Sequence, residues 1–227
     1  MKIDRRTVLF GLPLFAGGCV SGNFPAPPNP RLAAQPQYSP EMVAMYAAID
    51  TEPFPVPAID LRQVDPKFLR AEVAYDSPHP VGTIVVDPYA RYLYLVRERG
   101  RALRYGVGVG KVDAFNFTGE ATIARKAAWP SWRPTNDMIA REPDRYGPLS
   151  EGLPGGLTNP LGARALYLYR DGKDTYYRIH GTLEPWTIGT KVSSGCIRLL
   201  NQDIIDLHRR TPVGSKVIVL TASDAVA

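Results

Sequence analysis

A short segment towards the C-terminal end of the chain carries the residues best suited to nucleophilic chemistry. His180 ends a run of alternating polar and apolar residues, and Cys196 follows a Ser-Ser-Gly turn that opens another apolar run. A loop of this length can fold back and bring the imidazole beside the thiol. A thiol becomes a strong nucleophile when a neighbouring base removes its proton or a nearby cation lowers its pKa. We therefore predict that Cys196 is a nucleophile and that His180 is its general base and acid, with the sulfur ionised by the nearby imidazole.

The residues on either side of Cys196 could complete a site for acyl transfer. Gly195 has no Cβ, which lets the backbone turn sharply and lets a substrate carbonyl approach closely. The backbone N–H groups of Ser194, Gly195 and Cys196 could then point at a developing oxyanion. Arg198 lies two residues beyond the thiol and shares a face with it in an extended segment. Its planar guanidinium is suited to binding a substrate carboxylate.

The elements that must position these residues are mostly strands. From residue 81 onwards the apolar residues recur with a period of two, which predicts half-buried strands. Strands are expected at residues 82–87, 91–96, 102–109, 122–128, 164–169, 175–180 and 216–221. The first three should form an antiparallel meander, and Asp171-Gly172 should form a hairpin turn. An amphipathic helix is expected over residues 201–207, with Asn201 as its N-cap.

Two segments inside this predicted domain are glycine-rich. Residues 106–110 read Gly-Val-Gly-Val-Gly, but no Gly-Lys-Ser/Thr follows, so we reject a phosphate-binding loop and expect a strand end with close backbone packing. Residues 129–159 form a predicted irregular region, and so long a loop in a compact domain is usually functional or disordered. The whole pattern predicts a mainly β fold: a β-sandwich of mixed and antiparallel strands with one or two short helices and a long active-site loop.

The N-terminal part of the chain has the features of a targeting and tethering segment. Residues 1–18 read as an export signal, because positive charge precedes a short apolar run, and Arg5-Arg6 is similar to a twin-arginine motif. Cys19 ends a lipobox-like stretch and is a predicted lipidation site, with ordinary signal cleavage near the same place as the alternative. The remaining divisions are a Pro-rich linker, a short helical extension and a catalytic domain, at residues 19–40, 41–80 and 81–222. Ser39 is the expected N-cap of a short apolar helix over residues 42–49.

Composition and charge narrow the function further. The chain has 227 residues, of which 44% are hydrophobic, and this is enough for one domain with a hydrophobic core. The net charge of +5 suits binding to an anionic polymer. No basic run alternates with aromatic residues, so we do not expect nucleic-acid binding. None of the three histidines lies in a cluster with metal-ligand spacing, and we predict no metal, no cofactor and a monomer. We expect no disulfide between Cys19 and Cys196, because the predicted chemistry needs a free thiol.

The motif around the cysteine resembles that of a known family. The sequence H-G-T at residues 180–182, followed by S-S-G-C-I-R-L at residues 193–199, is similar to the signature of the L,D-transpeptidase (YkuD-type) catalytic domain. The resemblance covers about residues 81–221. Many members of that family carry His where this chain has Ser194, whereas the Cys–His pair is unchanged.

The resemblance implies an L,D-transpeptidase that acts on the tetrapeptide stems of peptidoglycan. Cys196 would attack the carbonyl between the third residue and the terminal D-alanine, form a thioester and transfer the acyl group to an amine acceptor, either another stem or a protein lysine. The carbonyl of Gly181 would orient His180, and residues 129–159 would lie over the active site as a lid. The substrate-binding residues would be Arg198, Ser193, Ser194, Asn159 and Trp132, the last with core packing as its alternative. The protein would be exported to the periplasm, where a lipidated Cys19 would anchor it at the inner face of the outer membrane.

Three other functions compete with this one. Hydrolysis of the thioester would make the protein an L,D-carboxypeptidase or an amidase, and its first half-reaction is identical. A sortase-like transpeptidase also uses Cys, His and Arg, but spreads them over more of the chain. A non-catalytic cell-wall-binding domain would not need an intact Cys–His pair.

Overall fold

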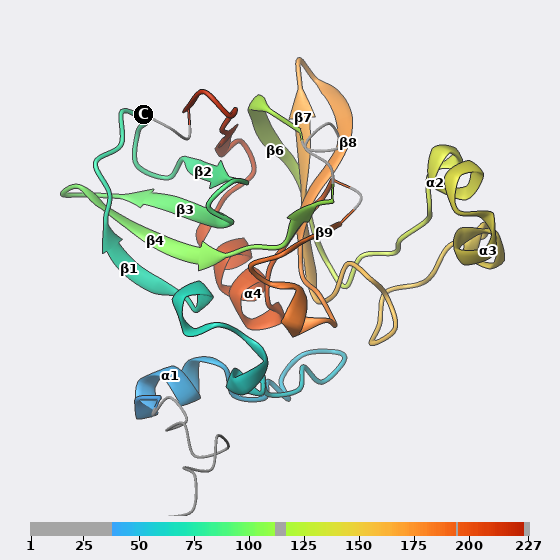
Figure 1. Cartoon of the computed structure of the whole chain (residues 1–227), viewed down its shortest axis with the longest axis horizontal. Helices are drawn as coiled ribbons and strands as arrows, with labels where there is room; N and C mark the ends of the chain where they lie inside the picture. The colour runs from blue at the N-terminus through green and yellow to red at the C-terminus, as the bar shows by residue number, and fades with distance from the viewer. Residues whose placement is uncertain (1–37, 112–116, 194, 225–227) are drawn as a thin grey trace, which may run out of the picture. The chain divides into compact units, whose positions relative to one another are not determined.

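The described part of the chain is built on one large mixed sheet. The computed structural model describes residues 38–111, 117–193 and 195–224. Within these ranges one sheet has the strand order β1-β4-β3-β2-β11-β6-β7-β8-β10, and β5 pairs with β9 in a second sheet (Figure 1). The strands are β1 (Ala71–Ala74), β2 (Ile84–Asp87), β3 (Tyr92–Arg97), β4 (Arg101–Gly106), β5 (Val109–Gly110), β6 (Gly119–Ala128), β7 (Arg164–Arg170), β8 (Lys173–His180), β9 (Lys191–Ser193), β10 (Ile197–Arg198) and β11 (Lys216–Val219). The helices are α1 (Pro40–Met45), α2 (Asn136–Arg141), α3 (Pro143–Tyr146) and α4 (Asn201–Arg210), and the 3-10 turns are η2 (Leu61–Gln63), η3 (Pro66–Phe68), η5 (Gly147–Leu149) and η6 (Pro185–Thr187).

The pairing of the strands follows from the alternation and the turns in the sequence. β2, β3 and β4 form the predicted antiparallel meander. Asp171 and Gly172 connect β7 to β8 with φ values of 51° and 75°, as a type I′ hairpin turn requires. β11 lies parallel to β2 and antiparallel to β6, and it thereby joins the N-terminal strands to the C-terminal ones.

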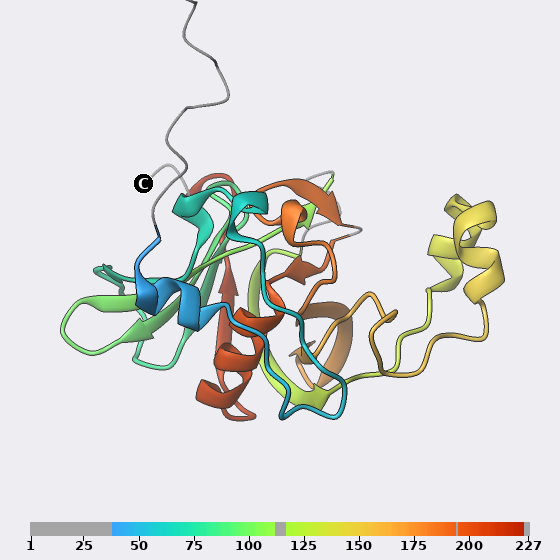
Figure 2. The same ribbon diagram turned by 90° about the horizontal axis from the view of Figure 1, so that it is seen from below.

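The main core lies between the two halves of the large sheet. It combines β2, β3, β7, β8 and α4, and its fully buried members include Ile84, Leu93, Leu166, Ile179 and Ile204. Figures 1 and 2 show α4 between strands β1–β4 and strands β6–β8. The two halves therefore face each other across a shared core, and the expected mainly β class is confirmed.

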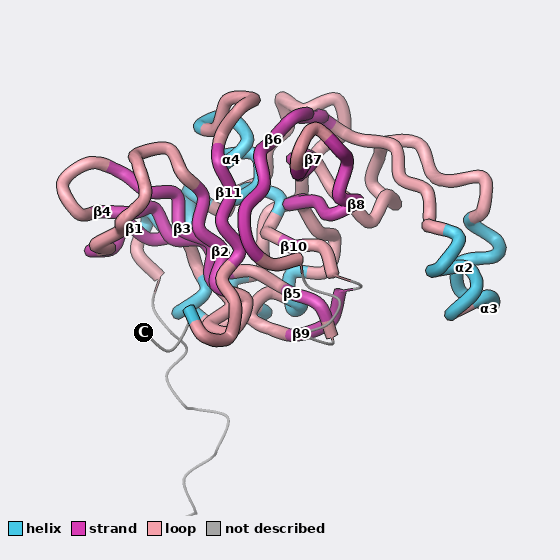
Figure 3. The backbone as a smooth tube through the Cα atoms, turned by 90° about the horizontal axis from the view of Figure 1, so that it is seen from above, coloured by secondary structure: helices cyan, strands magenta, loops and turns pink. Residues whose placement is uncertain are grey.

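The region predicted as an irregular lid contains helices, so that expectation is wrong in part. Thr135 caps α2, because its hydroxyl accepts the backbone N–H of Met138. Pro143 opens α3, where its missing N–H costs nothing. Figure 3 shows both helices at the end of the segment that leaves β6 and returns to β7. The sequence contains the residues that begin both helices, but the helices are too short to show the helical periodicity of apolar residues from which a helix is predicted.

Three further details differ from the sequence analysis. The helix of the extension ends at Met45, earlier than expected, and residues 71–74 form an edge strand, β1, that was not predicted. The N-cap of α4 is Leu200 rather than Asn201. Asn201 lies in the first turn, where its side-chain oxygen accepts the backbone N–H of Ala163 at 3.0 Å. Its carboxamide thus ties α4 to the start of β7 instead of capping the helix.

The glycine-rich run at residues 106–110 is confirmed as a strand end with close backbone packing. A Cβ on Gly106 would lie 2.3 Å from the carbonyl oxygen of Phe68, and one on Gly108 would lie 2.8 Å from that of Thr187. Both separations are too short for any residue with a side chain. The glycines therefore let neighbouring backbones approach β4 and β5 closely.

The extension before the domain packs on it as part of one structure. A second buried cluster joins the extension to the segment after His180, and its members are Tyr46, Leu61, Val64, Phe68, Leu69, Ile188 and Leu200. Among the described residues, we find no helix with the length and apolar character needed to cross a bilayer. The predicted signal, most of the linker and Cys19 lie outside those residues.

Candidate active site

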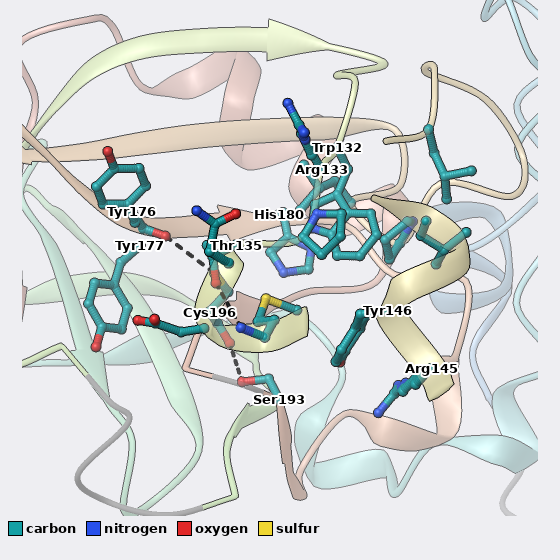
Figure 4. A pocket seen from close by; sticks show the side chains of 18 of the residues that line it. Trp132, Arg133, Thr135, Arg145, Tyr146, Tyr176, Tyr177, His180, Ser193 and Cys196 are labelled. Carbon is teal, nitrogen blue, oxygen red and sulfur yellow. Dashed lines mark hydrogen bonds between the residues drawn. The ribbon is translucent and has the colours of Figure 1, made fainter. Parts of the chain in front are cut away.

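Two parallel strands bring the predicted catalytic residues together. β10 lies beside β8, with Ile197 opposite Ile179 and Arg198 opposite His180. Cys196 immediately precedes β10. Because side chains alternate along a strand, Cys196, Arg198 and His180 leave the sheet on the same face. The loop between His180 and Cys196 thus returns as the sequence analysis expected, and both side chains line one cavity (Figure 4).

His180 is held in one tautomer by its own neighbour. Its Nδ1 lies 2.6 Å from the carbonyl oxygen of Gly181, the contact that the family resemblance implied. A carbonyl oxygen can only accept, so Nδ1 carries the proton and Nε2 is left as the basic nitrogen. The side chain is 4% exposed, and this burial, together with the positive charge of Arg198, lowers the pKa of His180 to about 3. The imidazole is therefore neutral near pH 7. Nε2 is the nitrogen open to a proton, and the lowered pKa makes it a weaker base than a free imidazole.

The glycine after His180 is required by a close neighbour on α4. A Cβ on Gly181 would lie 2.2 Å from Oδ1 of Asn201 and 3.1 Å from Cγ2 of Ile204. The same Asn201 oxygen accepts the N–H of Ala163, so it cannot move away without losing that bond. The first turn of α4 therefore fixes the position of the carbonyl that orients the imidazole.

Cys196 is a protonated thiol in this structure. Its Sγ donates a hydrogen bond to the carbonyl oxygen of Tyr176 at 3.9 Å. Burial raises the pKa of the Cys196 thiol, although the backbone N–H of Arg178 and the charges of Arg178 and Arg198 act in the opposite direction. Cys196 is a free cysteine. The resting pair is thus a neutral thiol beside a neutral imidazole, rather than the ionised sulfur that the sequence analysis expected.

The backbone at Tyr176 is shaped to present that carbonyl. Tyr176 has a φ of 62°, unusual for a bulky residue. The carboxylate of Asp174 accepts the Tyr176 N–H at 2.8 Å and stabilises this local turn, which lies within β8 next to an irregularity of its pairing with β7. The strained residue therefore lies directly beside the Cys196 thiol.

The loop that carries Cys196 is braced by Ser193. The Ser193 hydroxyl donates to the carbonyl of Cys196 at 2.6 Å and accepts the N–H of Gly195 at 3.0 Å. Ser193 is buried, and although it lines the cavity, its hydroxyl is occupied in bracing the turn. The Gly195 N–H, predicted to bind an oxyanion, is used by the same hydroxyl here. Ser194 lies outside the described residues.

Arg198 faces the cavity but is already paired. Its Nη1 lies 2.7 Å from Oε2 of Glu184, and the two side chains are 15% and 49% exposed. Its backbone also forms two hydrogen bonds with Gly108, each 2.9 Å long. The residue therefore braces the sheet through its backbone and presents a guanidinium that a substrate carboxylate would share with Glu184.

The cavity has a volume of about 1100 Å³, and residues of the segment 129–159 line part of it. Trp132, Tyr146 and residues of α2 line it together with Tyr176, His180 and Cys196. Trp132 therefore lies where the sequence analysis allowed it to contact substrate. Asn159 does not line the cavity. It is fully buried and its side chain bonds to the backbone of Leu153, Pro154 and Leu161, which favours a bracing role inside the lid over the predicted substrate contact.

Three residues of the site escaped the sequence analysis. Tyr176 supplies the acceptor of the thiol proton, Arg178 supplies a backbone donor and a charge near the sulfur, and Glu184 pairs with Arg198. The Asp-Thr-Tyr sequence at residues 174–176 could have suggested a turn within the strand. The other two contacts depend on the pairing of β8 with β10, for which the sequence carries no signal.

Comparison with known proteins identifies the family to which the chain is related. A family model described as the L,D-transpeptidase catalytic domain, YkuD, matches residues 82–219. The probable L,D-transpeptidase YbiS of Escherichia coli K12 is 41% identical over 145 residues, which are 63% of this chain and 45% of that protein. A putative L,D-transpeptidase of Fuscovulum blasticum is 36% identical over 138 residues, which are 60% of this chain and 68% of that protein. A crystal structure from Brucella melitensis, described as a probable carnitine operon oxidoreductase, is 49% identical over 71% of this chain and 99% of that chain, with a TM-score of 0.48.

The chain belongs to the L,D-transpeptidase (YkuD) catalytic-domain family. The resemblance on which the sequence analysis relied is thereby confirmed. The chain spans less than half of the length of YbiS, since the match covers 45% of that protein. The TM-score of the Brucella structure is below 0.5, and we base no functional assignment on that likeness.

Proposed function

We propose that the protein is a cysteine-dependent L,D-transpeptidase that acts on peptidoglycan stem peptides. The observation that carries the proposal is the neutral His180, whose Nε2 is left basic by the bond from Nδ1 to Gly181, on the wall of the cavity that holds the Cys196 thiol. The family of the chain supports the same reaction class. Its whole-protein activity and its substrate remain part of this proposal.

The proposed reaction has two half-reactions. As the sulfur of Cys196 attacks the carbonyl carbon before the terminal D-alanine, its proton passes to Nε2 of His180. The tetrahedral intermediate collapses when the C–N bond breaks and the leaving amine takes that proton, which leaves a thioester. An amine acceptor then attacks the thioester, loses a proton to His180, and releases the sulfur, which is reprotonated. The acceptor is another stem peptide or a lysine of a protein.

The oxyanion of the intermediate would be stabilised by backbone donors. The N–H groups of Gly195 and Cys196 are the candidates. For Gly195 this requires an exchange of partners, because its N–H donates to Ser193 before substrate binds. Arg198 would bind a carboxylate of the stem, in competition with Glu184.

Incubation of the purified protein with a disaccharide-tetrapeptide, with and without an amine acceptor, tests this proposal by mass analysis of the products. We expect release of D-alanine and a new amide to the acceptor, and neither product from Cys196→Ala. Product formation by Cys196→Ala, or none by the parent protein, would defeat the proposal. Release of D-alanine without a new amide would assign the L,D-carboxypeptidase instead.

A carbapenem gives an independent test of the nucleophile. We expect its mass to be added to the parent protein and not to Cys196→Ala, since a thiol that attacks a stem carbonyl should also open a β-lactam. A non-catalytic wall-binding domain would bind peptidoglycan without forming any such adduct.

We further propose that the chain is exported and anchored at the periplasmic side of a membrane through Cys19. The support is the signal-like sequence at residues 1–18 and the lipobox-like stretch before Cys19. Incorporation of a labelled fatty acid, lost in Cys19→Ser, tests the anchor. Label in both proteins, or in neither, would argue for ordinary signal cleavage.

A further inference from the structure

The extension of residues 41–80, which lies before the family-matched residues 82–219, brings the side chain of Phe68 against the active-site loop. Phe68 ends η3 and is 4% exposed. It belongs to the buried cluster that contains Ile188 and Leu200. Ile188 lies in the loop between His180 and Cys196, and Leu200 lies shortly after Arg198. Phe68 thus shares a buried cluster with one residue before Cys196 and one residue after it.

Two glycines form the notch that receives Phe68. A Cβ on Gly106 would lie 2.3 Å from the Phe68 carbonyl oxygen, and one on Gly189 would lie 2.1 Å from Cε2 of the Phe68 ring. Gly189 also has a φ of +83°, which favours glycine on conformational grounds. The ring therefore rests directly on the backbone of the active-site loop, with no side chain between them.

The loop is connected from this notch to the nucleophile by a backbone ladder. The Gly189 N–H donates to Val107 at 3.0 Å, the Val109 N–H to Thr190 at 3.1 Å, and the Lys111 N–H to Ser193 at 2.9 Å. Ser193 in turn holds the carbonyl of Cys196 at 2.6 Å. A shift of Gly189 against residues 107–111 would therefore be transmitted along β9 to the turn that bears the thiol.

The extension has its own attachments, so it can act as a fixed support. The Tyr46 hydroxyl donates to Asp203 of α4 at 3.2 Å and accepts the N–H of Arg70 at 2.7 Å. The Gln202 amide donates to the carbonyls of Ala47 and Pro57 at 3.1 Å and 2.9 Å. These bonds hold the residues before and after η3 against α4. None of them involves the active-site loop.

We infer that Phe68 is a positioning residue of the active site and that the extension is a working part of the catalytic domain. By filling the notch of Gly106 and Gly189, the ring sets the path of the loop between His180 and Cys196, and thus the placement of the thiol. Its effect on acylation rests on the proposed function. Its effect on the loop does not, because the contact is a property of the fold.

The test compares Phe68→Leu with Tyr75→Leu in the full chain. Tyr75 also belongs to the extension, but it stacks on Tyr94 at 4.3 Å and packs near Val85, Val96 and Ile218, away from the loop. Both changes shorten a packed aromatic side chain, so both should lower stability. Measurements are made where each variant is folded, and Phe68→Met, whose long and flexible side chain can extend into the space left by the ring, serves as the milder variant.

Two readouts separate a positioning role from a merely structural one. Amide hydrogen exchange at Val109 and Lys111 should accelerate in Phe68→Leu and not in Tyr75→Leu, because these amides donate to the loop. Acylation of Cys196 by a carbapenem should slow about tenfold to a hundredfold in Phe68→Leu, recover largely in Phe68→Met, and stay near the parent rate in Tyr75→Leu.

Unchanged exchange and acylation in Phe68→Leu, or equal losses in Tyr75→Leu, would overturn the inference. If the parent protein is not acylated, the proposed function fails, while the exchange result still decides the role of Phe68.

Discussion

The thiol of Cys196 donates a hydrogen bond to the carbonyl oxygen of Tyr176, 3.9 Å away. Burial raises the pKa of this thiol, and burial with the charge of Arg198 lowers the pKa of His180 to about 3. Neither group is charged near pH 7. In the reaction that we propose, the proton would therefore move during attack on the substrate rather than before it, as in general-base catalysis.

Alkylation of Cys196 should reveal this resting state. Because burial raises the thiol pKa above its usual value, we expect the rate constant for iodoacetamide to rise with pH up to and beyond pH 9. A thiolate–imidazolium pair would instead give a plateau near neutral pH. Intact-mass kinetics between pH 5 and 10 measure the profile. His180→Asn should leave it nearly unchanged while abolishing carbapenem acylation, and a plateau below pH 8 would contradict a neutral pair.

Gly181→Ala should impair catalysis more than folding. The added Cβ would meet Oδ1 of Asn201 at 2.2 Å, so the carbonyl that holds His180 Nδ1 must move. We expect kcat to fall at least about tenfold and the free energy of unfolding to fall by about 1–3 kcal/mol. Gly214→Ala is the matched control, because its φ of +92° brings strain with no atom within 4 Å of the new Cβ. That control should lose stability and keep kcat, and similar kcat values for both variants would refute the role of Gly181.

The sequence predicted those parts of the fold that depend on local patterns. Alternation located β2, β3, β7, β8 and β11, and the Asp171-Gly172 turn located the β7–β8 hairpin. Ser39 was identifiable as the cap of α1, since its hydroxyl accepts the Met42 N–H. β1 was missed, because four residues at an edge carry little alternation and owe their strand conformation to pairing with β4.

The site shows the same division between local and tertiary information. His180, Cys196 and the Gly181 contact are adjacent to recognisable motif residues, so the sequence could place them. The partners of Asn201 and Arg198 could not be predicted, because Ala163 and Glu184 approach them only after the chain has folded. The neutral resting state was also beyond the sequence, since it results from burial.

Asp203 should make stability fall as pH rises through neutrality. Asp203 lies in α4 and is fully buried. Burial raises the pKa of its carboxyl group to about 7, although the positive charge of Arg70 acts to lower it. The unfolded value is about 3.9. The folded state therefore binds this proton more tightly, and the stabilisation, complete below pH about 4, is lost as pH rises towards 7. Asp203→Asn lacks this loss, so its stability relative to the parent protein should improve from pH 5 to 8 in urea unfolding.

Asp174 is the matched control for that experiment. Burial would raise its pKa, but the hydrogen bonds from Arg178 and from the Tyr176 N–H outweigh burial and lower the pKa. It is ionised in both the folded and the unfolded state above pH 5. The stability difference between Asp174→Asn and the parent protein should therefore stay constant from pH 5 to 8. A constant difference for Asp203→Asn as well would show that Asp203 does not titrate in this range.

Glu184→Gln should distinguish the two roles assigned to Arg198. The carboxylate of Glu184 lies 2.7 Å from the guanidinium and is 49% exposed, so it can leave for solvent when another carboxylate arrives. Such a half-exposed pair contributes at most about 1 kcal/mol to stability. If Arg198 binds a stem carboxylate, the Glu184 carboxylate competes with it. Removing Glu184 should then lower KM about two- to fivefold, which corresponds to at most about 1 kcal/mol, and leave kcat unchanged. Arg198→Gln should raise KM for the same substrate. If the guanidinium only braces the loop, Glu184→Gln will not lower KM, and its effect will be confined to stability.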